Sequence, residues 1–594
     1  MKSLKITACL LLLFTTSCAE KVKENSSKSE IKKPNVILFL ADDQGWGDLN
    51  SSGNRNLNTP NIDALKTNGA SFNNFYVQPV CSPTRAEILT GRYFTRTGVY
   101  ETSSGGERIN LNETTIADIL KKAGYHTAAF GKWHNGMQPP YHPNSRGFDE
   151  YYGFASGHWG NYFSPMLEHN GTLVKGNGFL VDDLTDKGLE FIENNKTEPF
   201  FLYLPYNTPH SPMQVPDEFW NKMKDKSFDF LSDEHVNEDL QFTKAALAMV
   251  ENIDYNVGRI TDKVKSLNLE DETIIIYLSD NGPNAYRWNG GMKGKKGNVD
   301  EGGVRTPFYI QWTNHIQKGF MIDEIASGID ILPTLTGLLS IPLRTKMPID
   351  GEDLSPLLLG ETIENKNRFI YNHWNGKTSI RSQNFRLDNE NRLYDITNDR
   401  AQLKDIASSN TDIVKVMLEA KNNWEIETIN TTKENDNRAF TLGYPKAIYT
   451  QLPARDGEAH GNIKRSNRWP NDSFFTNWKS VNDAITWNVE ILEEGRFQVK
   501  MYYTCPEKDL GAIVELSFET SKIAAKITKP FNPPLVGKEE DRVPRMESYV
   551  KEFKPLNLGV MTLPKGKGTL TLKAIKVPNG QVGDFRLLQF KKVE

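Results

Sequence analysis

The chain has 594 residues, of which 25% are charged and 38% are hydrophobic, and its formal net charge is −4. This length is too great for one hydrophobic core and indicates about two to four domains. The composition is typical of a globular protein. The small net charge excludes the basic footprint of a nucleic-acid-binding chain, so we expect no nucleic-acid partner.

The first 18 residues predict an export signal. Two lysines precede an apolar run over residues 6–14, and small residues follow up to Cys18. This pattern is typical of a signal peptide, and the run is too short to span a membrane as a mature helix. Cys18 resembles the cysteine of a bacterial lipoprotein box, although Thr15 stands where that box usually has Leu. We expect a protein of the periplasm or cell surface, lipid-anchored through Cys18; plain secretion, with Cys18 incidental, is the alternative.

A polar segment over residues 19–33 follows, with too little apolar content to fold, and we interpret it as a tether. Exported proteins often pair their cysteines. Beyond the signal and Cys18, this chain has only Cys81 and Cys505. We expect Cys505 to be a free buried thiol in a strand; a Cys81–Cys505 disulfide is the competing interpretation.

Residues 34–366 predict an α/β domain with a large, mainly parallel sheet. Residues 239–267 have apolar side chains at helical spacing, which predicts a long helix packed on that sheet. Alternating strands and helices imply helices on both faces of the sheet, and functional loops in such folds lie beyond the carboxyl ends of the strands. The buried strands are expected at residues 35–41, 127–130, 200–205, 273–278 and 308–312.

The remaining chain predicts two further units. Residues 367–428 read as a small α+β subdomain with short strands and then a helix over 411–426, and a polar linker is expected over 427–444. Residues 445–594 predict an additional β-sandwich. Its role is left open between packing structurally or shaping the cleft and binding glycans by itself, because a fold does not give a function. Its strands are expected at residues 484–492, 495–503, 512–518, 568–575 and 585–592.

Two polar clusters at strand ends predict a cation site. Asp42 and Asp43 end the first strand, and Asp280 and Asn281 follow the strand at 273–278. Either pair alone is more often a turn or a helix cap. Strands of one sheet bring their ends to the same edge, so we expect the four side chains to converge. Three carboxylates and an amide favour a hard ion, Ca²⁺ or Mg²⁺, over zinc.

Four segments carry a family resemblance. Cys-Ser-Pro-Thr-Arg at residues 81–85 resembles the formylglycine-modification signature of the sulfatases, in the alkaline-phosphatase-like superfamily; a buried structural cysteine before a helix is the alternative. Gly-Lys-Trp-His at 131–134 is similar to a second signature, in which Phe130 replaces a smaller residue. His210 in a Pro-rich loop and Lys-Gly-Asn-Val-Asp-Glu-Gly-Gly at 296–303 match two more.

The resemblance covers about residues 34–426 and implies a sulfuric ester hydrolase. A maturation enzyme would oxidise Cys81 to formylglycine (3-oxoalanine), whose hydrate is the nucleophile. Residue 81 would also contact the cation, together with Asp42, Asp43, Asp280 and Asn281. The implied catalytic residues are Cys81, Arg85, Lys132, His134, His210 and Lys296.

Three of these assignments carry structural expectations. Lys132 and His134 alternate along an extended segment and should share one face. Lys296 is preferred to Lys293 and Lys295 because it keeps the family's spacing to the glutamate at 301. Glu301 and Arg305 are expected to hold this loop and not to touch substrate.

The expected substrate is a sulfated carbohydrate. The chain resembles bacterial polysaccharide sulfatases, which implies an algal polymer, with ulvan as the first choice. A formylglycine-dependent phosphodiester or phosphonate hydrolase, and a non-catalytic sulfated-glycan receptor with unmodified Cys81, are the alternatives. Aromatic and basic side chains suit sugar faces and anionic groups, and the candidate contacts are His158, Trp159, Asn161, Tyr162, Arg287, Trp288, His373, Trp374 and Arg381.

Overall fold

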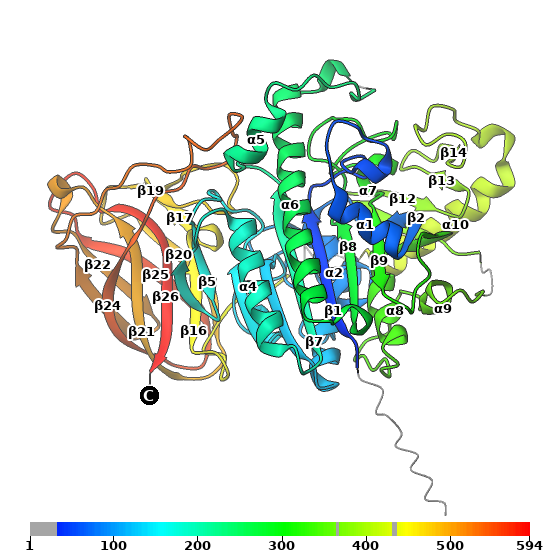
Figure 1. Cartoon of the computed structure of the whole chain (residues 1–594). Helices are drawn as coiled ribbons and strands as arrows, with labels where there is room; N and C mark the ends of the chain where they lie inside the picture. Colours follow the sequence, from blue (N-terminus) through cyan, green and yellow to red (C-terminus); the bar gives the residue numbers. More distant parts are fainter. Residues whose placement is uncertain (1–32, 234, 364–366, 430–435, 594) are drawn as a thin grey trace, which may run out of the picture.

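The computed structural model describes residues 33–233, 235–363, 367–429 and 436–593. The predicted signal peptide, the tether up to residue 32 and the predicted lipidation of Cys18 lie outside these residues. The described chain contains a ten-stranded sheet, a four-stranded sheet and two six-stranded sheets (Figure 1). None of the helices in this part of the chain is both long and apolar enough to cross a bilayer.

The ten-stranded sheet is mixed and has the order β10-β2-β9-β8-β1-β7-β3-β4-β5-β6. Its centre is parallel, from β8 through β1, β7 and β3 to β4. β9 runs antiparallel to both of its neighbours. All five predicted strands are present. The strands are β1 (Asn35–Asp42), β2 (Ala70–Tyr76), β3 (His126–Lys132), β4 (Glu150–Phe154), β5 (Met166–His169), β6 (Thr172–Lys175), β7 (Phe200–Pro209), β8 (Thr273–Ser279), β9 (Phe308–Trp312) and β10 (Phe320–Ser327).

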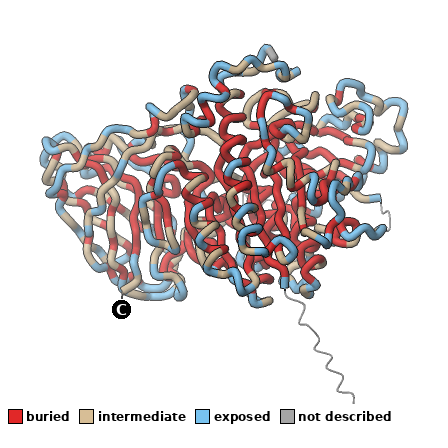
Figure 2. Tube along the Cα trace, viewed as in Figure 1, coloured by how far each residue is buried: buried red, intermediate tan, exposed pale blue. Residues whose placement is uncertain are grey.

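Helices cover both faces of this sheet, as predicted. In β1, Ile37 and Phe39 join the core formed with α1, α4 and α6, whereas Leu38 and Leu40 join the core formed with α2, α3 and α8. This division follows from the alternation of side chains along a strand, and Figure 2 shows the buried residues running through the sheet. The helices are α1 (Pro60–Asn68), α2 (Cys81–Thr90), α3 (Ile116–Lys122), α4 (Leu180–Asn195), α5 (Asp217–Met223), α6 (Leu240–Ser266), α7 (Glu301–Val304), α8 (Ile331–Leu338) and α9 (Ser355–Leu358).

A small antiparallel sheet follows, with the order β11-β12-β13-β14. Its apolar face packs on α10 (Thr411–Thr428) through Ile380, Leu387, Leu393 and Met417. The predicted short strands and the predicted helix over 411–426 are therefore confirmed. The strands are β11 (Ile370–Trp374), β12 (Lys377–Arg381), β13 (Phe385–Leu387) and β14 (Leu393–Asp395).

Two six-stranded sheets form the C-terminal β-unit, which we define as β15 to β26. Their facing side chains share one core, in which Trp487 of one sheet contacts Phe585 of the other. All five predicted strands are present. The strands are β15 (Phe440–Leu442), β16 (Tyr449–Pro453), β17 (Glu458–His460), β18 (Lys464–Arg465), β19 (Phe475–Trp478), β20 (Ala484–Ile491), β21 (Gly495–Thr504), β22 (Ile513–Phe518), β23 (Ser521–Lys526), β24 (Lys554–Leu563), β25 (Gly566–Lys576) and β26 (Gly583–Val593).

Two expectations need correction. The linker predicted over 427–444 is wrong at both ends, because α10 extends to Thr428 and β15 already pairs with β20. The Cys81–Cys505 disulfide is also wrong. Both thiols are free and buried; Cys505 lies directly after β21.

Candidate active site

Four polar side chains meet at the carboxyl ends of β1 and β8. These strands are parallel neighbours, so Asp42 and Asp43 emerge beside Asp280 and Asn281. The Asp43 backbone N–H donates to Asp280 Oδ1 (3.1 Å), and Asn281 Nδ2 donates to Asp43 Oδ1 (2.8 Å). Asp43 has a φ of 67°, a conformation uncommon for a residue other than glycine. The predicted convergence of the two clusters is confirmed.

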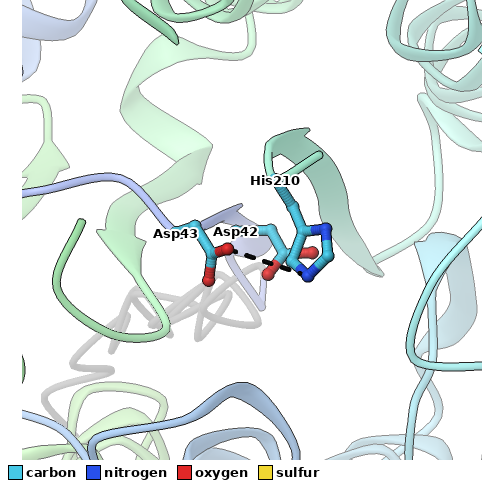
Figure 3. A group of neighbouring side chains, drawn as sticks. All are labelled: Asp42, Asp43 and His210. Carbon is cyan, nitrogen blue, oxygen red and sulfur yellow. Dashed lines mark ion pairs between the residues drawn. The ribbon is translucent and has the colours of Figure 1, made fainter. Parts of the chain in front are cut away.

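Cys81 lies against these carboxylates. It is the first residue of α2, and its Sγ lies with one oxygen each of Asp42 and Asp280 in a group whose atoms are all within 4.8 Å of one another. Asp42, Asp43 and His210 form a second such group, in which the three side chains point toward one another (Figure 3). Burial raises the pKa of the Cys81 thiol. The unmodified side chain is thus a neutral thiol and not a thiolate nucleophile.

The donor set fits a hard cation. Asp42 Oδ1 and Asn281 Oδ1 are buried and have no hydrogen-bond partner among the described residues. Leaving such buried acceptors without a partner costs free energy. A cation that takes oxygen ligands would satisfy both atoms by binding them. Burial and the charge of Asp42 raise the pKa of Asp280 to about 6. A bound cation would relieve the repulsion between these like charges. The residues that would hold the cation are Asp42, Asp43, Asp280 and Asn281.

Three basic side chains surround the carboxylates. Lys132 Nζ lies 2.6 Å from Asp42 Oδ2, and Lys296 Nζ lies 2.6 Å from Asp43 Oδ1. Arg85 donates to Asp280 Oδ2 from Nε (3.1 Å) and from its terminal nitrogen (2.8 Å). The site therefore combines a cation-binding edge with a set of positive groups suited to an anion.

The choice of Lys296 over its neighbours agrees with this geometry. Lys293 pairs with Asp300 (3.3 Å), and Lys295 lies over the ring of Tyr286. Of the three lysines, Lys296 is the one whose ammonium contacts the strand-end carboxylates. Burial lowers the pKa of Lys296, but the charge of Asp43 outweighs it and holds the pKa above its ordinary value.

His134 has a defined tautomer. Its Nε2 lies 2.8 Å from the carbonyl oxygen of Thr102, which accepts only, so Nε2 carries the proton. Nδ1 is buried without a partner among the described residues. Burial and Lys132 lower the pKa of His134, so the ring is neutral and Nδ1 offers a lone pair. His134 has a φ of 63°, so the expected extended segment through Lys132 and His134 is wrong.

His210 is held in the same manner. Its Nδ1 donates to the carbonyl oxygen of Ser211 (2.7 Å), and its Nε2 lies 3.7 Å from Asp43 Oδ2. Burial and Lys296 lower the pKa of His210 to about 4. The side chains of His210 and Lys296 are 15% and 22% exposed, whereas Asp43 is 1% exposed. A substrate therefore reaches the site from the side of His210 and Lys296.

His158 is the predicted substrate contact that lies at this site. Its ring centroid is 5.6 Å from that of His210, and both of its buried nitrogens lack a hydrogen-bond partner in the described chain. Trp159 turns away, stacking on Phe154 with Arg586 over its ring. The loop that carries both residues thus faces the site on one side and the C-terminal β-unit on the other.

Three other predicted contacts have structural roles, so their assignment to substrate is corrected. Arg287 is buried and pairs with Asp48 (2.7 Å). Arg381 is buried against Tyr76, to whose hydroxyl its Nε donates (2.9 Å). The buried hydroxyl of Tyr162 donates to the carbonyl oxygens of Ser211 (2.8 Å) and its predecessor (3.0 Å). Each polar group is already occupied inside the protein.

The remaining candidates make ordinary packing contacts. His373 Nδ1 bonds Thr378 Oγ1 (2.8 Å), and the rings of Trp374 and Trp288 pack near Phe94 and Phe230. Asn161 Nδ2 donates to the carbonyl oxygen of Phe163 (2.7 Å).

The expectation that Glu301 and Arg305 hold their loop is confirmed. Glu301 is fully buried and accepts hydrogen bonds from Arg386 Nε (2.9 Å) and the Tyr76 hydroxyl (3.2 Å). Arg305 lies 3.7 Å from the same carboxylate.

Sequence reasoning missed the residues that hold the two histidines. Thr102 belongs to an irregular loop whose letters carry no motif. Ser211 lies in the Pro-rich segment, from which the sequence predicts only His210 as a site residue. Gly157 was missed as well: a Cβ there would lie 2.1 Å from His134 Nε2. The contacts of Thr102 and Gly157 with His134 join residues that are distant in the sequence, so no local sequence pattern predicts them.

Comparison with known proteins gives the fold and the site a family. The sulfatase family model matches residues 34–341, more than half of the chain. N-acetylgalactosamine-6-sulfatase of Mus musculus is 31% identical over 375 residues, covering 57% of this chain and 68% of the mouse protein. An uncharacterized sulfatase of Schizosaccharomyces pombe is 26% identical over 545 residues, covering 70% and 98%.

Solved structures agree with this match. The crystal structure of Ps i-CgsB in complex with k-i-k-neocarrahexaose has a TM-score of 0.61 and 31% identity, and covers 68% of this chain and 96% of that one. The likeness therefore leaves about a third of the present chain without a counterpart in that protein. With the matched region spanning the cysteine motif, both strand-end clusters and both histidines, the chain belongs to the sulfatase family and is a sulfuric ester hydrolase of the alkaline-phosphatase-like superfamily.

Proposed function

We propose that this sulfatase removes sulfate from a carbohydrate, using formylglycine derived from Cys81 and a divalent cation, Ca²⁺ or Mg²⁺. The observation that carries the proposal is the grouping of Cys81 with Asp42 and Asp280. Lys132 and Lys296 contact the strand-end carboxylates of this site. A relative named N-acetylgalactosamine-6-sulfatase and the structure of Ps i-CgsB in complex with k-i-k-neocarrahexaose support a carbohydrate substrate. Within that class we keep the polymer ulvan as the first choice.

The chain's own residues divide the chemistry between two sides of the sulfate. When bound, the cation supplies charge that orients the sulfate and acidifies a hydroxyl of the hydrated residue 81. Lys132 and Arg85 balance negative charge beside that residue. On the open side, His210 and Lys296 bind the sulfate, and one of them protonates the departing sugar oxygen.

His134 acts in the second half of the cycle. Its free Nδ1 takes the proton of the second hydroxyl of residue 81, which releases sulfate and restores the aldehyde. An unmodified Cys or a Ser has no second hydroxyl and would remain esterified. The proposal therefore requires the oxidised side chain and not merely a nucleophile at position 81.

We further propose that the protein is exported and held at a membrane through lipidated Cys18. The basic, apolar and small-residue pattern of residues 1–18 supports this proposal. Metabolic labelling with a fatty-acid analogue tests it: label should be incorporated by the wild type and lost in Cys18→Ala. Export without label would support plain secretion.

Sulfate release tests the proposed function. Purified wild type should release sulfate, measured by ion chromatography, from at least one of ulvan, carrageenan and N-acetylgalactosamine 6-sulfate oligosaccharides. Cys81→Ala should release none. Faster cleavage of bis(4-nitrophenyl) phosphate than of 4-nitrophenyl sulfate would favour the phosphodiester hydrolase instead.

Mass spectrometry tests the modification separately. The tryptic peptide of residues 67–85 contains Cys81. An aldehyde or its hydrate supports the enzyme, whereas an intact thiol in protein matured by its own host supports the non-catalytic receptor.

A further inference from the structure

The C-terminal β-unit reaches both catalytic histidines through the residues that hold them. His134 Nε2 donates to the carbonyl oxygen of Thr102, and that same oxygen accepts a hydrogen bond from Asn471 Nδ2 (3.2 Å). His210 Nδ1 donates to the carbonyl oxygen of Ser211, whose hydroxyl donates to Glu547. Asn471 and Glu547 both belong to the C-terminal β-unit.

The contact near His134 is anchored by a buried charge network. Arg455 donates to Asn471 Oδ1 (2.8 Å) and to Ser156 Oγ (3.0 Å), and it pairs with Glu107. Arg455 is 3% exposed. Glu107 in turn accepts from the Gly105 backbone N–H (2.9 Å). The loop that offers its carbonyl to His134 is therefore fixed at two points, both connected to the C-terminal β-unit.

We infer that Asn471 and Glu547 are positioning residues for catalysis, and that the C-terminal β-unit is part of the active site and not a separate binding module. A carbonyl that accepts Nε2–H fixes the His134 tautomer and leaves Nδ1 as the base. Without the Asn471 donor, the Thr102 carbonyl is held less firmly in place. The His134 ring that donates to this carbonyl is then no longer held in a single orientation. The same argument applies to His210, whose Nε2 is directed toward Asp43.

This inference rests on the proposed function, because it concerns the histidines of that reaction. It predicts an effect on kcat more than on KM, since neither side chain needs to touch substrate. Misplacement of a catalytic group by about 1 Å costs roughly a hundredfold in rate, so we expect losses of roughly tenfold to a hundredfold in kcat for the disruptive variants.

Four variants of the full-length protein separate positioning from general stability. Asn471→Asp removes the donor to Thr102 but keeps an acceptor for Arg455. Glu547→Ala removes the acceptor of the Ser211 hydroxyl, whereas Glu547→Gln keeps one and should restore kcat. Thr441→Val is the matched control, because its Oγ1 donates across the same interface to the carbonyl oxygen of Pro139 (2.8 Å) and touches neither histidine.

The measurements are kcat and KM with 4-nitrophenyl sulfate, melting temperature, and ring-nitrogen NMR of ¹⁵N-histidine-labelled protein, with the His134 signal assigned from His134→Gln. We expect Asn471→Asp to lower kcat and to convert the Nε2–H signal of His134 into that of a tautomer mixture, while Thr441→Val changes neither. A wild-type tautomer with wild-type kcat in both Asn471→Asp and Glu547→Ala would overturn the inference. So would equal losses in Thr441→Val.

The NMR measurement does not need turnover, so the inference and the proposed function fail separately. A wild type that releases no sulfate from any substrate counts against the proposed function. An active wild type whose His134 tautomer is unchanged by Asn471→Asp counts against the positioning role alone.

Discussion

At the residue scale, Gly157 is constrained by close approach and not by its own backbone. Its missing side chain leaves room for His134, since a Cβ would lie 2.1 Å from Nε2. We expect Gly157→Ala to displace the ring and to lower kcat by roughly tenfold or more, as misplaced catalytic groups do. Gly580→Ala is the control, because its Cβ would meet only the Asp509 carboxylate at 3.4 Å. Steady-state kinetics with wild-type kcat in Gly157→Ala would contradict this interpretation.

His158 gives a second prediction at this scale. It is a buried ring with two unsatisfied nitrogens beside His210, and burial lowers its pKa, so the ring is neutral. A hydrogen bond from this ring to an anionic substrate would contribute about 1.5–3 kcal/mol. We expect His158→Ala to raise KM for a sulfated oligosaccharide by roughly tenfold or more, and His460→Ala on the exposed β17 to have no effect. Equal KM values in the two variants would remove His158 from the substrate contacts.

At the element scale, the parallel pairing of β1 and β8 brings together the side chains of the proposed cation site. Addition of Ca²⁺ to chelator-treated wild type should raise the melting temperature, since a ligand at 100 times its Kd stabilises the folded state by about 2.7 kcal/mol. Asp42→Asn removes one carboxylate charge and should reduce that shift. Asp262→Asn, on the exposed side of α6, should not. An identical calcium shift in all three proteins, measured by differential scanning fluorimetry, would place the cation elsewhere.

Glu301 ties α7 to the small antiparallel sheet. Burial raises its pKa, but Arg386 and Arg381 outweigh burial and lower the pKa below its ordinary value. Glu301→Gln leaves buried guanidinium groups unpaired, which should lower the free energy of unfolding by about 3–5 kcal/mol. The urea midpoint of this variant should therefore fall. Glu270→Gln, at an exposed position, should leave the midpoint unchanged.

The pH dependence of this contribution follows from the depressed pKa. The stabilisation is complete above the unfolded-state value of about 4.3 and disappears as the pH falls through the lower folded-state value. The difference in urea midpoint between wild type and Glu301→Gln should therefore persist at pH 5 and shrink only in stronger acid. A difference that vanishes by pH 5 would contradict the assigned role.

The elements also show how far sequence alone could go. Runs such as 273–278 are buried on both faces, so their composition revealed the strands, and the carboxylates at their ends indicated the site. The short strands β5 and β6, which lie at one end of the sheet order, carry no such run and were missed. The αL conformation of His134 and the burial of Arg287 and Arg381 depend on distant partners, so sequence reasoning assigned them wrongly.

At the scale of the whole molecule, buried polar contacts join the C-terminal β-unit to the sulfatase fold. Arg108 donates to the carbonyl oxygens of Arg438 (2.7 Å) and Ala439 (2.9 Å), which directly precede β15, and Gln138 Nε2 donates to Asp456 Oδ2 (3.0 Å). Such an interface couples the unfolding of its two sides more tightly than a flexible linker does. We expect one heat-absorption peak in scanning calorimetry, shifted as a whole by Arg108→Ala. Two peaks, of which only one moves, would show independent units.

The direction of β1 has a consequence for how the enzyme faces its surroundings. Asn35 begins the strand at one edge of the sheet and Asp42 ends it at the other, about 25 Å away for eight residues. In Figure 1 the described chain starts at the edge opposite the strand ends that carry the candidate active site. If the chain is attached to a lipid surface by its amino end, the opening beside His210 looks outward, toward polymers arriving from the medium.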